Sequence, residues 1–553
     1  MSQSIKKWFD TGVPWIWLNA GAVSASVIMV SGLILLISVK ALSHFWPAQL
    51  IAFDYLESDG SVSRYLGEIT DEEITTAIRA DLTELAGGPE VPVTRYLVKT
   101  GNRDISGLDF RWVASLRIQR SSHPENAMVV ERREWGNFYG YPAAIKSNGE
   151  TVSIGDSLWQ DLQQRLERSN QLIEEINFIE KDLIGAINYK MERIRLKERG
   201  YELENITDPA KFRELEQQEA QLQDEYNELT ERLDTLYEQA RRDSLVATVV
   251  DGKEVEIPLA QVVRAFRPNA MSLTDKFGFY FMKMWEFVSE EPREANTEGG
   301  IFPAIFGTVM MVLIMSVMVT PFGVVAAVYL REYAKQGVIT RTIRIAVNNL
   351  AGVPSIVYGV FGLGFFVYFL GGSIDQLFFP EALPAPTFGT PGILWASLTL
   401  AILTVPVVIV ATEEGLSRVP REIREGSLAL GATKAETLWR TVLPMTAPAM
   451  MTGLILAVAR AAGEVAPLML VGVVKLAPSL PLDGNFPFLH LDRKFMHLGF
   501  HIYDVGFQSP NVEAARPLVY ATAFLLVLII IILNLTAMRI RNRLREKYRA
   551  AEQ

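Results

Sequence analysis

The chain contains no cysteine among its 553 residues. This absence excludes disulfide bonds, thiolate metal sites and cysteine nucleophiles, and it leaves the redox compartment open. The sequence also lacks the pattern Gly-x4-Gly-Lys-Ser/Thr, with which P-loop proteins hold nucleotide phosphates. Any nucleotide that drives this protein would therefore bind on a partner. A net charge of −10 argues against nucleic acid as a partner.

Long apolar runs are what the sequence does contain. A helix needs about 20 predominantly apolar residues to cross a bilayer. The runs predict an α-helical polytopic membrane protein with six spans, at residues 17–42, 301–330, 347–370, 393–411, 447–474 and 517–538. The first run is longer than a signal-peptide core of about 7–15 residues and lacks a clear cleavage site, so we interpret it as a retained anchor.

The distribution of Lys and Arg predicts the orientation of these spans. Basic residues gather in segments 331–344, 414–446 and 539–553, whereas 371–392 has none. Because basic loops stay in the cytoplasm, we expect these three segments and both termini to be cytoplasmic. Residues 43–300, between the first two spans, then lie outside. We expect the basic tail after the last span to contact anionic lipid headgroups.

The segment outside the membrane has the pattern of a small α/β domain with a helical insertion. Strand-like alternation at 151–154 and 245–250 flanks a long helical stretch, and a break at 205–209 divides that stretch in two. The second half has apolar residues at heptad spacing, which predicts an antiparallel coiled-coil hairpin. These are Phe212, Leu215, Leu222, Tyr226, Leu229, Leu233, Leu236 and Ala240.

Two interpretations of this hairpin stay open. It can be a spacer or assembly strut without a ligand, or a docking arm for a partner. The predicted organisation is then an N-terminal tail and first span (1–42), an outer domain (43–300) with a hairpin at about 158–243, a five-helix core (301–538) with a cytoplasmic loop at 414–446, and a basic tail (539–553).

A polar segment at 420–444 separates two of the spans. Its landmarks are Glu425, Gly431 and the pair Leu443 and Pro444. Glycine tolerates the left-handed conformation that ends a helix, so we expect a helix before Gly431 and a second one starting near Thr433. Pro444 falls near the entry to the fifth span, where its missing N–H costs least. The segment predicts a rigid protrusion that could sit in a groove on another protein.

Two charged residues, Arg460 and Glu464, lie within the predicted fifth span. Their spacing places them on one face of a continuous helix. Ionisable groups at membrane depth usually face a bundle interior or a polar pathway. The planar guanidinium of arginine can bind two oxygens of an oxyanion at once. The pair is either a structural ion pair that locks the bundle or a pathway pair that attracts an anion, and the two roles are compatible.

Two further sets of residues are weaker candidates. Pro354, Ser355, Tyr358 and Gly359 lie at the start of a glycine-rich stretch, which predicts close helix packing or a gate. Three histidines precede the last span, and we expect them to be scattered on the surface rather than to bind a metal. They are His490, His497 and His501.

The segment at 420–444 resembles the EAA loop of ABC importer permeases. Glu425, Gly431 and the Leu443–Pro444 pair are in register with that pattern, while Gly426, Ser427 and Thr441 replace its two alanines and its isoleucine. Stretches 298–308, 351–366 and 460–464, together with the opening of the chain, resemble the permeases of the bacterial phosphate ABC importer. The closer match is the PstA type, in its long form with an enlarged periplasmic loop.

This resemblance implies a type I ABC importer permease in the bacterial inner membrane. It implies inward transport of inorganic phosphate, with a second permease of the PstC type, a homodimeric cytoplasmic ATPase of the PstB type and a periplasmic binding protein of the PstS type. ATP and Mg would bind on the ATPase, leaving no cofactor and no enzymatic activity on this chain. Arg460 and Glu464 would lie on the substrate pathway. Glu425, Gly431, Leu443 and Pro444 would couple to the ATPase.

Three alternatives belong beside this interpretation. A permease for another oxyanion, such as sulfate or molybdate, would have the same layout. A membrane-anchored scaffold or sensor would use the coiled coil and need neither an ATPase nor Arg460. An intramembrane hydrolase lacks support, because the spans show no recognisable nucleophile, base or metal-ligand constellation.

Overall fold

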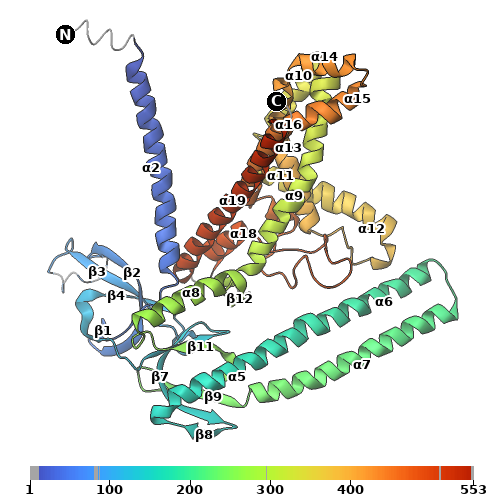
Figure 1. Ribbon diagram of the computed structural model, residues 1–553. Coiled ribbons are helices and arrows are strands. Elements are labelled where there is room, and N and C mark those ends of the chain that lie inside the picture. Colours follow the sequence, from blue (N-terminus) through green and yellow to red (C-terminus); the bar gives the residue numbers. More distant parts are fainter. Residues whose placement is uncertain are drawn as a thin grey trace, which may run out of the picture.

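The computed structural model describes residues 11–79, 82, 85, 87–293, 296–509 and 512–549. Within these residues it has six helices long and apolar enough to cross a membrane, which confirms the predicted number of spans. Figure 1 shows these helices in one half of the molecule and a β-rich domain with a long helical hairpin in the other. The first ten residues, including most of the predicted N-terminal tail, lie outside the described residues.

Five of the spans form a bundle around α13 (Ile393–Arg418). Helices α9 (Phe302–Val328) and α16 (Leu443–Gly463) pack on α13. Small residues allow this close approach: a Cβ added to Gly323 would lie 2.5 Å from the Val408 side chain, and one added to Gly453 would lie 2.7 Å from that of Ala411. The remaining two are α11 (Ser355–Phe361), which continues through π-helical turns into α12 (Gly372–Phe378), and α19 (Val512–Arg549).

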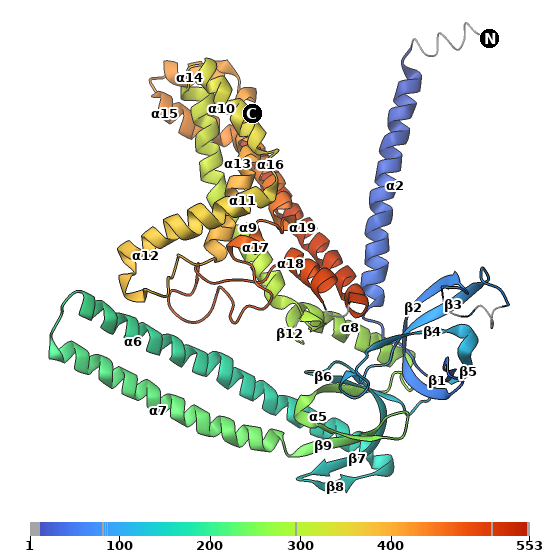
Figure 2. The same ribbon diagram turned by 180° about the vertical axis from the view of Figure 1, so that it is seen from behind.

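The first span, α2 (Val13–Ser43), stands apart from this bundle. In Figures 1 and 2 it approaches the bundle at its lower end, where it packs against α19. Nearly all of its apolar side chains are exposed, including Leu33 and Leu35 at 60% and 65%. These side chains therefore face lipid or another protein in the membrane.

Several predicted span boundaries differ from the structure; the third and fourth spans, for example, end at Phe378 and Arg418 rather than at residues 370 and 411. The third span begins at Ser355, because residues 338–350 form a separate helix, α10 (Val338–Leu350), and the chain turns before Pro354. The fifth span ends at Gly463 rather than near residue 474, and a short helix, α17 (Leu468–Val471), follows it. The basic tail predicted as a separate segment continues α19 without a break as far as Arg549.

The described part of the outer domain contains two antiparallel sheets, of five and six strands, and a two-stranded pair at residues 292–299. The five-stranded sheet has the order β4-β3-β2-β1-β5, and the six-stranded sheet has the order β10-β9-β7-β6-β11 with β8 beside β7. The first sheet comprises β1 (Leu50–Leu56), β2 (Val62–Thr76), β3 (Pro92–Lys99), β4 (Phe110–Ala114) and β5 (Ile118–Ser122). The second comprises β6 (Met128–Arg132), β7 (Phe138–Ser147), β8 (Glu150–Ser153), β9 (Asp243–Thr248), β10 (Glu254–Pro258) and β11 (Val262–Phe266).

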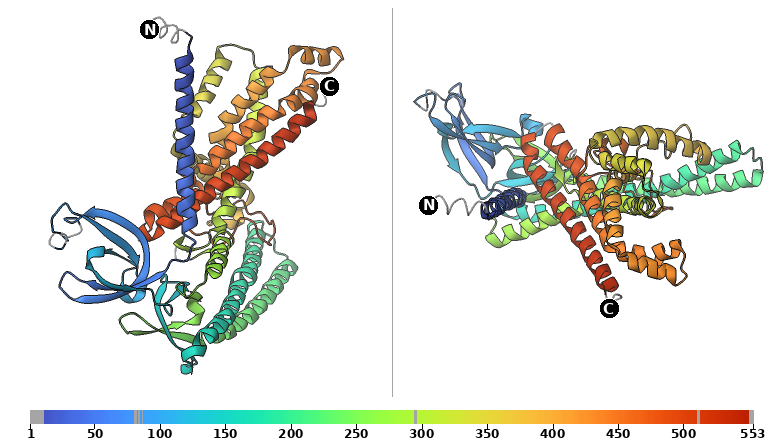
Figure 3. Two further views of the ribbon diagram at one scale, coloured as in Figure 1. Left: turned by 60° about the vertical axis from the view of Figure 1, so that its left-hand side comes forward. Right: turned by 90° about the horizontal axis from the view of Figure 1, so that it is seen from above.

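The helical hairpin is inserted between β8 and β9. One arm is α5 (Leu158–Phe178), a π-helical stretch and α6 (Gly185–Leu203), and the other is α7 (Pro209–Ala240). Asp208 caps α7 by accepting a hydrogen bond from the Ala210 N–H at 3.0 Å. The arms meet along an apolar seam that includes Ile176, Ile179, Leu233 and Leu236. Figure 3, seen from above, shows the hairpin running beneath the bundle toward α12.

The far part of the hairpin contacts the outer loops of the bundle. The Tyr189 hydroxyl donates to the Phe486 carbonyl at 2.7 Å, and the Tyr189 ring meets His490 edge-on with centroids 5.6 Å apart. A cavity of about 1630 Å³ lies between the hairpin and loop residues 377–390 and 484–493. The hairpin therefore links the outer domain to the outer face of the bundle, while its biological role stays a prediction.

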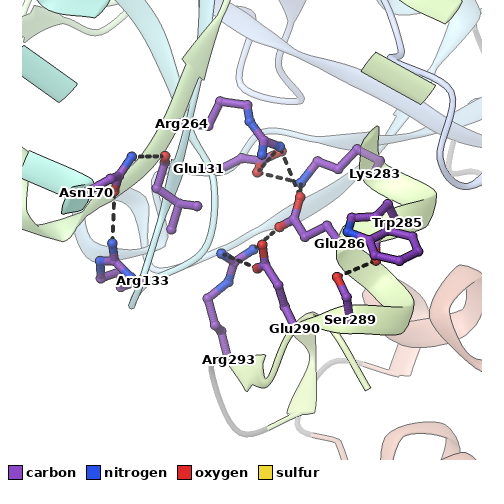
Figure 4. Close-up of polar contacts among 11 residues, drawn as sticks. Glu131, Arg133, Asn170, Arg264, Lys283, Trp285, Glu286, Ser289, Glu290 and Arg293 are labelled. Atoms are coloured by element: carbon purple, nitrogen blue, oxygen red, sulfur yellow. Dashed lines mark hydrogen bonds and ion pairs between the residues drawn. The ribbon is translucent and has the colours of Figure 1, made fainter. Parts of the chain in front are cut away.

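A buried ion cluster joins strands β6 and β11 of the outer domain to the segment that leads into α9 (Figure 4). It centres on Glu286 of α8 (Leu273–Ser289), which contacts Arg293 at 2.8 Å and both Arg264 and Lys283 at 3.1 Å. Lys283 also contacts Glu131 of β6 at 2.6 Å. Burial raises the pKa of Glu286, but Lys283, Arg264 and Arg293 outweigh it and lower the pKa from 4.5 to about 2.

The variant Glu286→Gln should destabilise the outer domain. A carboxyl whose pKa falls from 4.5 to about 2 on folding contributes about 3 kcal/mol of stability above pH 4.5. In the unsubstituted chain this contribution should be lost as the pH falls from 4.5 toward about 2. The stability of the variant should lack this pH-dependent decrease. Urea unfolding of the full chain in detergent, followed by tryptophan fluorescence at several pH values, measures both effects.

Glu290→Gln is the matched control. Glu290 lies one turn further along, is exposed, and approaches Arg293 only at 3.9 Å. An exposed pair of this kind contributes about 1 kcal/mol or less. Equal destabilisation by the two variants would contradict the central place of Glu286 in the cluster.

Candidate functional site

The loop between α13 and α16 forms a helical protrusion. It contains α14 (Arg421–Ala429), a turn at Gly431 with φ of +90°, and α15 (Lys434–Thr437). Thr433 begins α15 with a capping box, in which its side chain and that of Glu436 bond reciprocally to backbone N–H groups. The chain then enters α16 at Leu443, with Pro444 in its first turn. The left-handed glycine and the helix starting after Thr433 agree with the geometry expected from the sequence.

Polar contacts hold this protrusion against the ends of the spans. Arg424 pairs with Glu332 at 3.1 Å and donates to the Leu416 carbonyl at 2.6 Å. The hydroxyls of Ser427 and Thr437 share a hydrogen bond of 2.9 Å, which ties α14 to α15. Ser427 replaces an alanine of the EAA pattern, and this hydrogen bond is a structural reason for a serine there.

The outward face of the protrusion carries side chains without internal partners. Glu425 is exposed, and Leu430 and Trp439 are 91% and 75% exposed. Leu430 therefore points away from the rest of the loop. Val338 and Ile339 at the start of α10 are 83% and 77% exposed, and Figure 1 shows α10, α14 and α15 gathered at the end of the bundle away from the outer domain. Exposed apolar side chains of this kind are typical of an interaction surface.

Arg460 and Glu464 lie at the opposite end of α16. Their side chains approach to 3.6 Å, Arg460 being 33% and Glu464 21% exposed. The expectation that one continuous helix face carries both is wrong, because α16 ends at Gly463 and Glu464 has an extended backbone with ψ of 135°. Arg460 lies about 26 Å along the helix from Leu443, at about 1.5 Å per residue. The pair is therefore far from the protrusion.

The chain after α16 folds back against the start of α11. A Cβ added to Gly359 would lie 2.6 Å from the Pro467 Cα, so only glycine permits this contact. The Tyr358 hydroxyl donates to the Leu350 carbonyl at 2.7 Å, and Tyr358 lies within electrostatic range of Arg460. Pro354 and Ser355 occupy the cap and first position of α11. The structure thus gathers the packing residues and the charged pair around the end of α16.

This arrangement suits recognition of an anion. The Arg460 guanidinium is partly exposed and engages Glu464 through Nε at 3.6 Å, which is longer than a hydrogen bond. An incoming oxyanion could therefore compete with Glu464 for the guanidinium donors. Helix α16 ends at Gly463, so both side chains lie where the helix gives way to loop. The C-terminal end of a helix carries a partial negative charge, so the Arg460 guanidinium, and not the helix dipole, would attract an anion here.

The expectation of surface histidines before the last span is wrong. His490, His497 and His501 are 4%, 1% and 2% exposed. His490 lies 2.9 Å from Asp483, which also pairs with Arg493 at 2.6 Å. Burial lowers the pKa of His497 and His501 to about 4, so both are neutral at pH 7. Among the described residues no group of three potential ligands could hold a metal ion.

Sequence reasoning missed the Asp483 contacts and the Glu286 cluster. The partners of Asp483 lie 7 and 10 residues away in an irregular loop, where no periodicity exists to reveal them. The partners of Glu286 come from β11, α8 itself and β12 (Pro292–Arg293), which pairs with β13 (Glu298–Gly299). Only the tertiary fold brings these charges together.

The chain resembles known transport proteins. Residues 319–549 match the family described as "Binding-protein-dependent transport system inner membrane component". The phosphate transport system permease protein PstA 1 of Mycobacterium tuberculosis (strain CDC 1551 / Oshkosh) is 35% identical over 247 residues, covering 44% of this chain and 71% of the relative. PstA of Mycobacterium leprae is 35% identical over 218 residues, covering 39% of this chain and 66% of the relative, just under two thirds.

A solved structure of the MetNI methionine ABC transporter also aligns with the chain. The alignment covers 50% of this chain and 99% of the solved chain, at 17% identity and a TM-score of 0.32. The identity to the mycobacterial proteins and the family match over the bundle are the decisive findings. This chain belongs to the binding-protein-dependent transport permeases and, within them, to the PstA-type phosphate transport system permeases.

Proposed function

We propose that this chain is a membrane-spanning permease subunit of an ATP-driven importer of inorganic phosphate. The proposal rests on the positions of two sites at opposite ends of one bundle helix, α16, in a chain of this permease family. An exposed protrusion bearing Glu425 lies at one end of α16, and the Arg460–Glu464 pair lies at the other. Movement of the protrusion can reach the anion-binding end through α16 itself. The names of the relatives supply phosphate as the substrate.

The proposed assembly needs several partners. A second permease of the PstC type completes the translocation path, and a homodimeric ATPase of the PstB type binds the protrusion. ATP and Mg bind on that ATPase, so this chain carries no cofactor and performs no covalent chemistry. A binding protein of the PstS type delivers phosphate. The chain lies in the bacterial inner membrane with both termini cytoplasmic and residues 43–300 periplasmic. This orientation follows because the basic segments lie on the same side of the membrane as the protrusion, and basic loops stay in the cytoplasm.

Uptake of labelled phosphate tests this proposal. Cells lacking the gene should regain uptake when the intact chain is restored, and excess sulfate or molybdate should not compete. Uptake suppressed by one of those anions would assign the chain to another oxyanion. If restoring the chain changed the uptake of neither phosphate, sulfate nor molybdate, the transport proposal would be contradicted and the scaffold alternative favoured.

A further inference from the structure

Helix α8 (Leu273–Ser289) has two unlike faces. One face is buried against the outer domain through Phe279, Lys283 and Glu286, and the Phe279 ring lies 4.6 Å from that of Phe266. The opposite face carries large apolar side chains at every fourth position. Leu273, Phe277, Phe281 and Trp285 are 71%, 54%, 65% and 72% exposed. Residues four apart share a helix face, so these four form one continuous stripe, the α8 stripe.

Contacts with two membrane spans fix the position of α8 along the membrane normal. At the foot of α2, the Trp46 ring lies 5.3 Å from Phe277, and the Phe45 ring lies 5.2 Å from Phe287. At the other end, the Phe302 N–H at the start of α9 donates to the Glu290 carbonyl at 3.1 Å. Helix α8 therefore lies where α2 leaves the membrane and α9 enters it. In Figures 1 and 2 it runs across the direction of α2 rather than along it.

We propose that α8 lies in the outer headgroup layer of the membrane, with the α8 stripe inserted among the lipid chains. Aromatic side chains are enriched at this level of membrane proteins. Amphipathic helices lying in the interface bury their apolar face about 5–10 Å deep. The stripe adjoins α2, whose exposed apolar surface already requires a lipid or protein environment in the membrane. The inference rests on the membrane topology and is independent of the transported substrate.

Lipid is the occupant that the surroundings favour. The stripe is apolar along its whole length and lies at the end of two spans, so any bilayer that accommodates α2 reaches it. The charged side chains of Lys283 and Glu286 lie on the opposite face of α8, where Glu286 contacts Arg264, Lys283 and Arg293 (Figure 4). Helix α8 would thus anchor the outer domain at a fixed height above the bilayer. The ion cluster would connect α8 to the strands of that domain.

The absence of cysteine permits a direct test. The single variants Phe281→Cys and Trp285→Cys, each carrying an environment-sensitive fluorophore, are purified in the full chain with its partner subunits. They are reconstituted into vesicles of phosphatidylethanolamine and phosphatidylglycerol, with or without phospholipid bearing a nitroxide near the top of the acyl chain. The matched control is Gln217→Cys, an exposed position on α7 of the hairpin.

The two positions on α8 should lose roughly half of their emission or more to the lipid nitroxide, because it lies at the expected insertion depth. They should also be protected from iodide in the water, and position 217 should show the reverse pattern. Quenching of positions 281 and 285 by iodide alone would overturn the proposal, since the stripe would face water. Protection from both quenchers would also overturn it, because a protein, such as the second permease, would then cover the stripe.

Discussion

Replacing Arg460 by alanine should abolish most phosphate uptake while the complex still assembles. Arg460 lies at the end of α16, partly exposed and 3.6 Å from Glu464. A hydrogen bond to a charged group contributes about 1.5–3 kcal/mol. Losing one such interaction with a phosphate in transit therefore predicts a decrease in uptake of roughly 10- to 100-fold, at about 1.4 kcal/mol for each tenfold change. Uptake by vesicles containing the purified complex measures the loss, and size-exclusion chromatography reports assembly.

Two companion variants separate the pathway role from a structural ion pair. Arg460→Lys keeps the charge but loses the planar donors, so it should restore only part of the uptake. Glu464→Gln removes the ion pair and leaves the guanidinium, so it should impair uptake less than Arg460→Ala. Equal losses in Arg460→Ala and Glu464→Gln would indicate that the pair only locks the bundle. Normal uptake by Arg460→Ala would refute the pathway role.

The spans were predictable because hydrophobicity decides whether a helix can cross a bilayer. The misplaced ends have a common cause. Apolar composition continues from 464 to 474, but Pro467 and Gly472 lie where the chain has already left the helix. Composition alone does not register such a break. At 347–350 the stretch Val-Asn-Asn-Leu carries no charge that would set it apart from the following span, but it belongs to α10.

The outer domain was less predictable for a different reason. Strands β8, β9 and β10 lie at the ends of the hairpin or next to a clear turn. The alternation of apolar and polar residues in the sequence predicted their positions. Some of the other strands show weaker alternation, because their residues pack on both faces. In β6, for example, all five residues are buried. Burial of that kind depends on the neighbouring strands, and so did the buried positions of His497 and His501.

The Glu425→Lys variant should release the ATPase from the permease. Glu425 is exposed on α14, so its charge can be reversed without disturbing the packing of the protrusion. Placing a like charge in a complementary contact costs several kcal/mol, and about 1.4 kcal/mol corresponds to a tenfold weaker affinity. Co-purification of the ATPase with a tagged permease should therefore fall at least roughly tenfold, and phosphate uptake should fall with it.

Glu422→Lys supplies the matched control on the same short helix. Glu422 is also exposed but lies in the first turn of α14, one position after Arg421. Its reversal changes the net charge of the protrusion by the same amount, so any general electrostatic effect should appear in both variants. A specific contact predicts that Glu422→Lys retains most of the ATPase and Glu425→Lys does not. Equal retention in the two variants would remove Glu425 from the contact and leave the exposed Leu430 and Trp439 as the remaining candidates for it.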